Sequence, residues 1–224
     1  MHALKLDHVS KIYGQDSNRV VALDDISFEA KQGELTLILG PSGSGKSTLL
    51  TIIGGLQSPT QGTVQVNDQP IMMDNRQDAD AFRLNQVGFV LQSHSLVPFL
   101  TVQQQFDLVD HVKKTGNLNA SSFQRYLTIL GIESLGDKYP SELSGGQAQR
   151  VAIARALYTN PDFILADEPT AALDSARVQK VGALFQQIAV ANKKSVVIVT
   201  HDLRLKQFAD HIYTIEDGHI HQEK

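Results

Sequence analysis

The sequence predicts an α/β fold with a mainly parallel sheet, an N-terminal antiparallel β-subdomain and an inserted helical subdomain. Three observations support this prediction. Short apolar runs at residues 35–39, 163–166 and 196–199 are rich in leucine, isoleucine and valine, as is typical of strands buried on both faces of a sheet. Alternating apolar and polar residues precede the first run. Between about residues 93 and 156, helix-like patterns replace the strand signals.

The N-terminal part of the chain is predicted to be mostly strand. Residues 4–9 and 21–28 alternate well enough to pair as antiparallel strands, and residues 62–66 are expected to form another strand of this side sheet. The apolar run at 35–39 leads into a glycine- and serine-rich turn. Residues 46–54 then have the composition and spacing of a helix. The chain therefore follows the order strand, loop, helix at this turn.

Helices are expected in the middle of the chain, and strands return after it. Helical patterns cover residues 102–112, 121–130 and 147–157. Strand and helix then alternate again, with a helix at about 176–191 between the last two apolar runs and a final stretch up to residue 220. The helical part is therefore expected to be an insertion into the α/β core.

The composition argues against several classes of function. Of the 224 residues, 42% are hydrophobic and 20% are charged, which fits a compact domain with an appended lobe. The formal net charge is −4 and no lysine- or arginine-rich run stands out, so we expect no nucleic-acid partner. The absence of cysteine excludes disulfides and thiolate metal sites.

Secretion and direct membrane insertion are not expected either. The N-terminus lacks the cationic start and apolar stretch of a signal peptide. The most apolar runs are far shorter than the roughly 20 residues that cross a bilayer. We therefore expect a cytoplasmic protein, in which any membrane role would have to come from a partner.

A complete phosphate-binding motif lies between the first buried strand and the helix that follows it. The motif, Gly-x-x-x-x-Gly-Lys-Ser, consists of Gly40, Pro41, Ser42, Gly43, Ser44, Gly45, Lys46 and Ser47. Its glycines let backbone N–H groups turn inward around phosphates, and the following helix presents its positive end to them. A merely flexible turn would not require the lysine and the hydroxyl. The motif therefore predicts a P-loop NTPase core of the RecA-like kind.

The motif also predicts ATP and Mg²⁺ as ligands. Lys46 is expected to reach the β- and γ-phosphates, Ser47 to coordinate Mg²⁺, and Thr48 to belong to the nucleotide-binding set. Asp167 and Glu168 end the second apolar run, so they should emerge at the same edge of the sheet as the P-loop. Asp167 would hold Mg²⁺ and Glu168 would act as general base, although two acids can also simply cap a strand–helix turn.

A second glycine-rich segment precedes the last predicted helix of the insertion. It reads Leu-Ser-Gly-Gly-Gln and contains Ser144, Gly145, Gly146 and Gln147. The serine hydroxyl, the open N–H groups and a helix that starts at Gln147 offer a site for another anion. A turn with an ordinary helix N-cap is the alternative. The segment closely resembles the signature sequence of ABC (ATP-binding cassette) ATPases.

This resemblance covers nearly the whole chain and implies the ATP-hydrolysing subunit of an ABC transporter. It implies a head-to-tail homodimer in which the signature of one subunit caps the ATP on the P-loop of the other. It also implies one domain over residues 1–224, with a nucleotide-binding core and antiparallel β-subdomain at 1–92 and 157–224 and a helical signature subdomain at 93–156. A separate transmembrane permease would hold the chain peripherally at the inner face of the cell membrane.

Four residues match weaker family marks, in the expected order. Tyr13 resembles the aromatic that stacks on adenine, and Gln92 resembles the glutamine that links Mg²⁺ to the helical subdomain. Asp174 lies in the loop that couples the two sites, and His201 resembles the switch histidine at the γ-phosphate. Taken singly, the tyrosine is more often packing and the glutamine solvated.

Two further features lie in or beside the helical subdomain. The apolar segment between Gln92 and Leu100 is where relatives dock the permease, although its side chains can also simply pack the helical subdomain. Many relatives carry Glu-Asn where this chain has Gln104 and Gln105, a change expected to affect only the helical subdomain.

Two sets of residues suggest the type of transporter. Residues 54–56 and 87–102 resemble the branch of macrolide, lipoprotein, antimicrobial-peptide and haem extruders. Within that branch, residues 92–98 and 202–218 resemble the ATPases of haem-regulated efflux pumps. Antimicrobial peptides, macrolides and lipoproteins remain alternative cargoes. A non-transport ABC ATPase would usually carry a coiled coil or a second cassette, and a regulatory cassette would have a damaged Lys46, Glu168 or His201.

Overall fold

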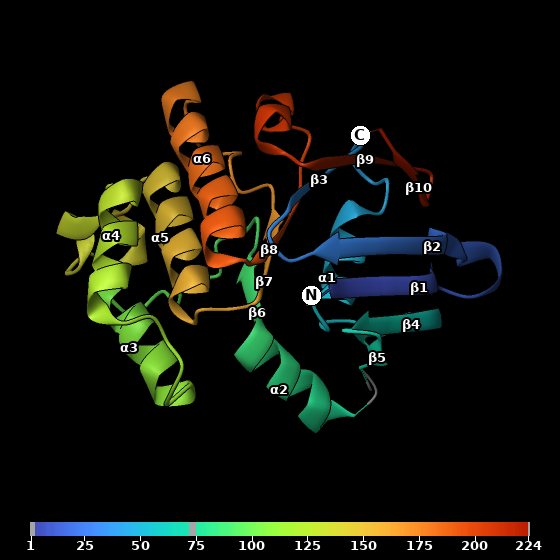
Figure 1. Cartoon of the computed structure of the whole chain (residues 1–224), viewed down its shortest axis with the longest axis horizontal. Coiled ribbons are helices and arrows are strands. Elements are labelled where there is room, and N and C mark those ends of the chain that lie inside the picture. The colour runs from blue at the N-terminus through green and yellow to red at the C-terminus, as the bar shows by residue number, and fades with distance from the viewer. Residues whose placement is uncertain (1–2, 72–74, 224) are drawn as a thin grey trace.

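The computed structural model describes residues 3–71 and 75–223, which form two sheets and a set of helices (Figure 1). The smaller sheet has the strand order β2-β1-β4-β5 and is antiparallel. Its strands are β1 (Ala3–Tyr13), β2 (Val20–Lys31), β4 (Gln61–Val66) and β5 (Gln69–Pro70). The larger sheet has the order β10-β9-β3-β8-β7-β6. Its strands are β3 (Leu35–Leu39), β6 (Val87–Val90), β7 (Phe163–Asp167), β8 (Ser195–Val199), β9 (His211–Glu216) and β10 (His219–Gln222).

The larger sheet is parallel except at one edge. β6, β7, β8, β3 and β9 pair in parallel, and only β10 runs antiparallel to its neighbour β9. The predicted combination of a mainly parallel sheet and an N-terminal antiparallel sheet is confirmed.

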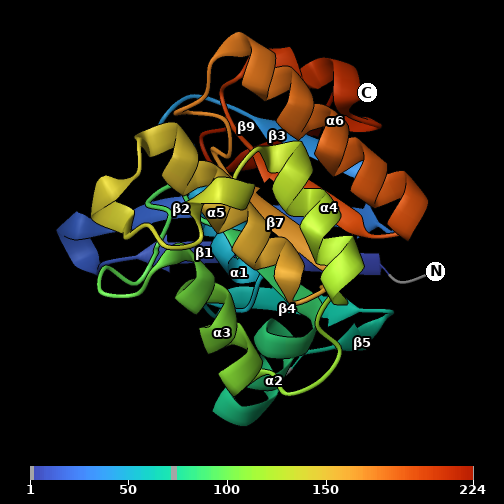
Figure 2. The ribbon, with the colours of Figure 1, turned by 90° about the vertical axis from the view of Figure 1, so that its left-hand side faces the viewer.

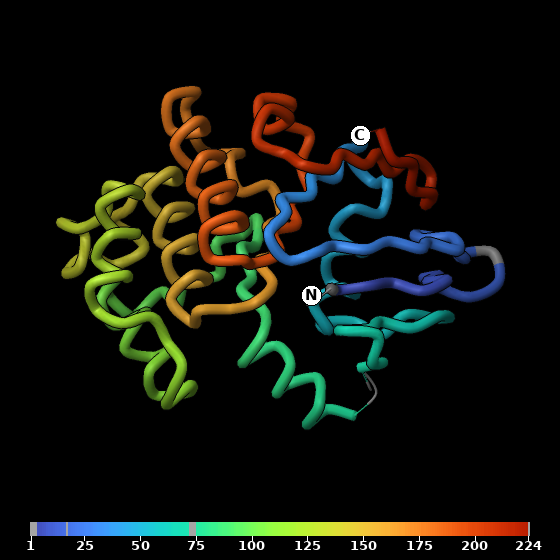
Figure 3. The backbone as a smooth tube through the Cα atoms, viewed as in Figure 1, coloured from blue at the N-terminus to red at the C-terminus, as the bar shows by residue number. Residues whose placement is uncertain are grey.

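The helices gather on two sides of this sheet. They are α1 (Lys46–Ile53), α2 (Arg76–Gln86), α3 (Val102–Val112), α4 (Ala120–Leu130), α5 (Gly145–Tyr158) and α6 (Ser175–Asn192). Short 3₁₀ segments are η1 (Asp16–Asn18), η2 (Glu133–Leu135), η3 (Pro140–Glu142) and η4 (Leu203–Phe208). The chain path in Figure 3 shows that α3, α4 and α5 come between β6 and β7 in the sequence and lie together at one end of the molecule. Within the described ranges no helix is long and apolar enough to cross a membrane.

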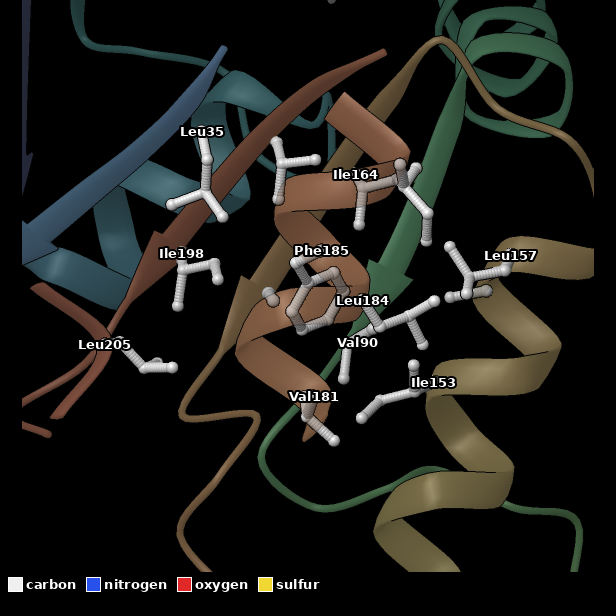
Figure 4. Packing of buried hydrophobic residues seen from close by; sticks show 14 of the residues in the cluster. Leu35, Val90, Ile153, Leu157, Ile164, Val181, Leu184, Phe185, Ile198 and Leu205 are labelled. Carbon is white, nitrogen blue, oxygen red and sulfur yellow. The ribbon is translucent and has the colours of Figure 1, made fainter. Parts of the chain in front are cut away.

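Alternate residues of the central strands face two different cores. Leu35, Ile164 and Ile198 belong to the core beneath α5 and α6 (Figure 4), whereas Leu165 and Val197 belong to the core shared with α1 and the smaller sheet. This alternation follows from the two-residue period of a strand. Figure 2 shows α3 to α6 covering the near side of the sheet. The sheet is therefore buried on both faces, as its continuous apolar runs predict.

Candidate nucleotide site

The residues predicted from separate motifs meet at one edge of the larger sheet. β3, β8, β7 and β6 are parallel neighbours, so their carboxyl-terminal ends form a row. Ile38 pairs with Val199, and Val199 pairs with Asp167. The P-loop, the His201 loop and the two carboxylates therefore begin at the same level, at the edge where open α/β sheets bind ligands.

The P-loop forms the turn between β3 and α1 and is packed against neighbouring backbone. Gly40 has φ 154°, and a Cβ there would lie 2.3 Å from the carbonyl oxygen of Ile215. Gly45 has φ 103°, and a Cβ there would lie 2.3 Å from that of Ala22. Both positions therefore require glycine. The other motif residues lie in this turn or in the first turn of α1: Pro41, Ser42, Gly43, Ser44, Ser47 and Thr48.

Lys46 begins α1, and its ammonium group folds back over the P-loop. It donates hydrogen bonds to the carbonyl oxygens of Gly40 (2.8 Å) and Pro41 (2.7 Å), and the residue is buried. The pKa of Lys46 is lowered, because the effect of burial exceeds the opposite effect of the nearby carboxylates of Glu168 and Asp167. The lysine therefore lies close to both acids and points its charge at the loop.

Asp167 and Ser47 bring two oxygen ligands together. Burial raises the pKa of Asp167, and a hydrogen bond from Ser47 lowers it. A half-buried carboxylate beside a hydroxyl matches the hard oxygen ligands that Mg²⁺ prefers. The residues at this position therefore fit the predicted metal.

Glu168 is held by three hydrogen bonds from the loop after β8. Its Oε2 accepts from the hydroxyl of Thr200 (2.6 Å), and its Oε1 accepts from the backbone N–H of His201 (3.1 Å) and lies 2.8 Å from His201 Nδ1. The Glu168 side chain is only 10% exposed, whereas that of His201 is 75% exposed. Glu168 also has φ 47°, a left-handed conformation that is unusual for a side-chain-bearing residue. The structure thus places both predicted catalytic residues in direct contact.

Tyr13 ends β1, in the smaller sheet. Its hydroxyl donates to Gln57 Oε1 (2.6 Å), and Lys11 Nζ lies 5.3 Å from the ring centroid, within cation–π range. The residue is 39% exposed. The ring is therefore fixed at its hydroxyl and remains accessible for stacking.

Gln92 follows β6, at the end of the row of strand ends, and is exposed. After it, Phe99 is the most exposed large hydrophobic side chain of the described residues, at 75%. Two side chains, one on α3 and one on α5, form hydrogen bonds with the backbone of the segment that carries Phe99. Gln105 on α3 pairs with both the N–H (3.0 Å) and the carbonyl (2.8 Å) of Val97, and Arg155 on α5 donates to the carbonyl of Ser95 (2.8 Å).

Gln105→Ala is expected to lower the free energy of unfolding by about 1–3 kcal/mol, because the buried Gln105 makes two hydrogen bonds to the partly buried backbone of Val97 and each contributes about 0.5–1.5 kcal/mol. Gln103→Ala, on the exposed face of the same helix, is the matched control and should change it by less than about 0.5 kcal/mol. Urea unfolding followed by circular dichroism measures both. Equal stability of the two variants would show that Gln105 does not hold the segment.

The signature residues lie at the start of α5. Ser144 is the N-cap, and its side chain and that of Gln147 form a reciprocal capping box. The helix begins at Gly145, two residues earlier than predicted, because this capping box includes both glycines in the first turn. Gly146 lies against the loop before α6, where a Cβ would come 3.0 Å from the carbonyl oxygen of Ala172.

Asp174 is the N-cap of α6 and also forms an ion pair with Arg177. It therefore follows directly the loop that packs beside the signature. Figure 1 shows α5 and α1 on opposite sides of the larger sheet. The two glycine-rich segments, which lead into α1 and α5, are therefore separate from each other in the structure.

Sequence reasoning missed several residues that hold the predicted ones in place. Thr200 contacts Glu168, although it lies 32 positions away in the sequence. The signal was a hydroxyl directly before His201 at the end of a buried strand. Gln105 and Arg155 gave no comparable signal, because their partners are backbone atoms of a loop without regular structure.

Comparisons with known proteins agree with this geometry. A family model described as ABC transporter matches residues 23–171. The chain is 42% identical over 221 residues to the "Putative hemin import ATP-binding protein HrtA" of Staphylococcus aureus strain Newman, covering 97% of this chain and 99% of that protein.

Solved structures are similar as well. The dimeric structure of MJ0796, described as a bacterial ABC transporter cassette, has a TM-score of 0.89 and 36% identity, with 99% of each chain covered. A post-hydrolysis state of MJ0796 bound to ADP and Pi has a TM-score of 0.87 and 37% identity, again with 99% of each chain covered. The cbiO1 protein of Clostridium perfringens, part of the ABC transporter complex cbiONQ, has a TM-score of 0.80 and 30% identity, with 97% of this chain and 86% of that chain covered.

Proposed function

Because this chain belongs to the ABC transporter family as an ATP-binding, ATP-hydrolysing subunit, we propose that it powers a separate membrane permease that exports haem. The ATPase activity is supported by one observation: the P-loop, the acids Asp167 and Glu168, and His201 all lie at the same edge of the larger sheet. The 42% identity with a protein named as a putative hemin import ATP-binding protein supports the cargo.

The P-loop is proposed to bind the phosphates of ATP. Lys46 leaves the carbonyl oxygens of its own loop and donates to the β- and γ-phosphates, which are better acceptors because they are charged. The buried hydroxyl of Ser44 has no partner in the described part of the chain, and a phosphate oxygen would supply one. Tyr13 stacks on the adenine.

Ser47 and Asp167, with Gln92 at the end of the row, are proposed to hold Mg²⁺. When bound, the ion neutralises charge on the phosphates during hydrolysis. Glu168 accepts a proton from the attacking water as general base. His201, with an exposed ring anchored to Glu168 at Nδ1, is free to meet the γ-phosphate with Nε2.

Two copies are proposed to form a head-to-tail dimer with two ATPs between them. In this arrangement Ser144, Gly145, Gly146 and Gln147 of one copy cover the γ-phosphate bound to the other, and Asp174 lies between the two sites. Separate glycine-rich sites on opposite sides of the sheet support this arrangement, because one nucleotide cannot occupy both.

The helical subdomain at residues 93–156 is proposed to carry the permease, docked on the segment from Gln92 to Leu100. The exposed Phe99, on a segment held by α3 and α5, supports this assignment. ATP-driven closure of residues 1–92 and 157–224 onto a second copy would then move the permease. The chain would act at the inner face of the membrane.

Cargo and direction can be tested in the native host with a Glu168→Gln chromosomal variant. If haem is exported, the variant cells retain more haem than wild type and become sensitive to hemin, while sensitivity to macrolides and antimicrobial peptides is unchanged. Reduced haem uptake would instead show import, the direction in the name of the Staphylococcus aureus relative. Unchanged haem content together with macrolide or peptide sensitivity would assign one of the other cargoes.

A further inference from the structure

The loop after β8 contributes Thr200, Asp202 and Arg204 to a hydrogen-bonded group around Glu168, and none of these three has yet been given a role in catalysis. Thr200 is fully buried, and its hydroxyl oxygen accepts a hydrogen bond from the backbone N–H of Asp202 (3.0 Å). The Thr200 hydroxyl therefore donates its proton to its other partner, Glu168 Oε2, which lies 2.6 Å away. The direction of this hydrogen bond is fixed by the loop itself.

Asp202 is in turn held from two sides. Its Oδ2 accepts from the hydroxyl of the buried Thr170 (2.9 Å), and the guanidinium of Arg204 binds both of its carboxylate oxygens at 2.8 Å. Arg204 also donates to the hydroxyl of Ser175 (3.0 Å), the first residue of α6. These contacts lower the pKa of Asp202, with the hydrogen bonds from Arg204 as the largest cause. These contacts fix the Asp202 side chain against Thr170 and, through Arg204, against the start of α6, while the Asp202 backbone N–H bonds Thr200.

After these hydrogen bonds, only one oxygen of the Glu168 carboxylate can accept a further hydrogen bond from within reach of the loop. A carboxylate offers about four acceptor sites, two on each oxygen. Among the described residues, Oε1 has two partners, the backbone N–H and Nδ1 of His201, whereas Oε2 has one, the hydroxyl of Thr200. The free site of the carboxylate therefore lies on Oε2, beside the Thr200 hydroxyl.

We infer that Thr200 is a positioning residue for the general base: its hydroxyl, aimed by Asp202 and Arg204, holds Glu168 so that Oε2 takes the proton of the attacking water. This inference depends on the proposed role of Glu168. Thr200 touches neither phosphate nor water in this scheme, and it acts through the carboxylate alone. A hydroxyl at this position is sufficient, so serine should replace threonine.

The test compares kcat and KM of ATP hydrolysis for the purified full chain with Mg²⁺. Thr200→Val keeps the shape but removes the donor, and kcat should fall about tenfold or more while KM for ATP changes less than about twofold. Thr200→Ser should restore kcat to within about threefold of wild type. The matched control is Thr36→Val in β3, a buried threonine whose hydroxyl has no partner in the described residues. It should leave both constants unchanged.

Arg204→Ala provides a second variant at an exposed site, for the case in which Thr200→Val does not fold. Its kcat should fall about threefold at unchanged KM, because Asp202 loses its two-point anchor. Wild-type kcat in Thr200→Val, or in Arg204→Ala if only that variant folds, overturns the inference. Inactive Glu168→Gln with fully active Thr200→Val would reject this inference alone, whereas fully active Glu168→Gln would reject the proposed base itself.

Discussion

Glu168→Gln should lower kcat for ATP hydrolysis by about 10²–10⁴-fold, the usual contribution of a general base. The amide has nearly the shape of the carboxylate and fills the same space, but its NH2 group cannot accept one of the hydrogen bonds from the loop after β8, and it cannot take the proton of the attacking water. ATP binding should persist, because Lys46 and the P-loop backbone are untouched. Steady-state phosphate release and ATP affinity, measured on the same preparation, separate the two effects.

The same variant should accumulate as a dimer in ATP and Mg²⁺. If hydrolysis separates the two copies, a base-deficient chain remains in the closed state for as long as ATP is bound. Size-exclusion chromatography should therefore show a dimer with ATP and a monomer with ADP. Glu133→Gln, an exposed acid in the helical subdomain, is the control and should behave as wild type. A Glu168→Gln protein that hydrolyses ATP as fast as wild type would contradict the assignment of the base.

The elements that could be predicted from the sequence are those with a strong period or a complete motif. β3, β7 and β8 were predicted because burial on both faces leaves an uninterrupted apolar run. β6 has only four residues, one of them glycine, and so it lacks this signal. α2 is polar along most of its length and buries only Ala79 and Phe82, so its period is weak.

The candidate site was predictable as a set of motifs but not as a network of contacts. Parallel strands end at a common edge, so the order of motifs was enough to predict that Asp167, Glu168 and His201 meet near the P-loop. Which atoms touch depends on register and on the left-handed backbone at Glu168, and neither is visible in the sequence. The hydroxyl of Thr200 is the clearest example, because only the pairing of β7 with β8 brings it to Glu168.

Lys46→Ala should weaken ATP binding by about 10²-fold or more. Each charge-assisted hydrogen bond contributes about 1.5–3 kcal/mol, Lys46 is expected to make one to each of two phosphates, and 1.4 kcal/mol corresponds to a factor of ten. The fold should be preserved, because the two carbonyl oxygens that Lys46 binds in the free chain lie in a loop. Lys180→Ala on the exposed face of α6 is the control. Titration with a fluorescent ATP analogue measures both affinities.

A pH series distinguishes a direct charge contact from a general loss of the pocket. Burial lowers the pKa of Lys46 below that of an ordinary lysine, so the free chain loses this proton at a lower pH than solvated lysines do. Only the charged form binds phosphate strongly, so ATP affinity should decline as the pH rises through that lowered pKa. In Lys46→Ala this alkaline decline should disappear. A variant that binds ATP weakly but keeps the decline would assign the pH dependence to another group and leave Lys46 a structural role.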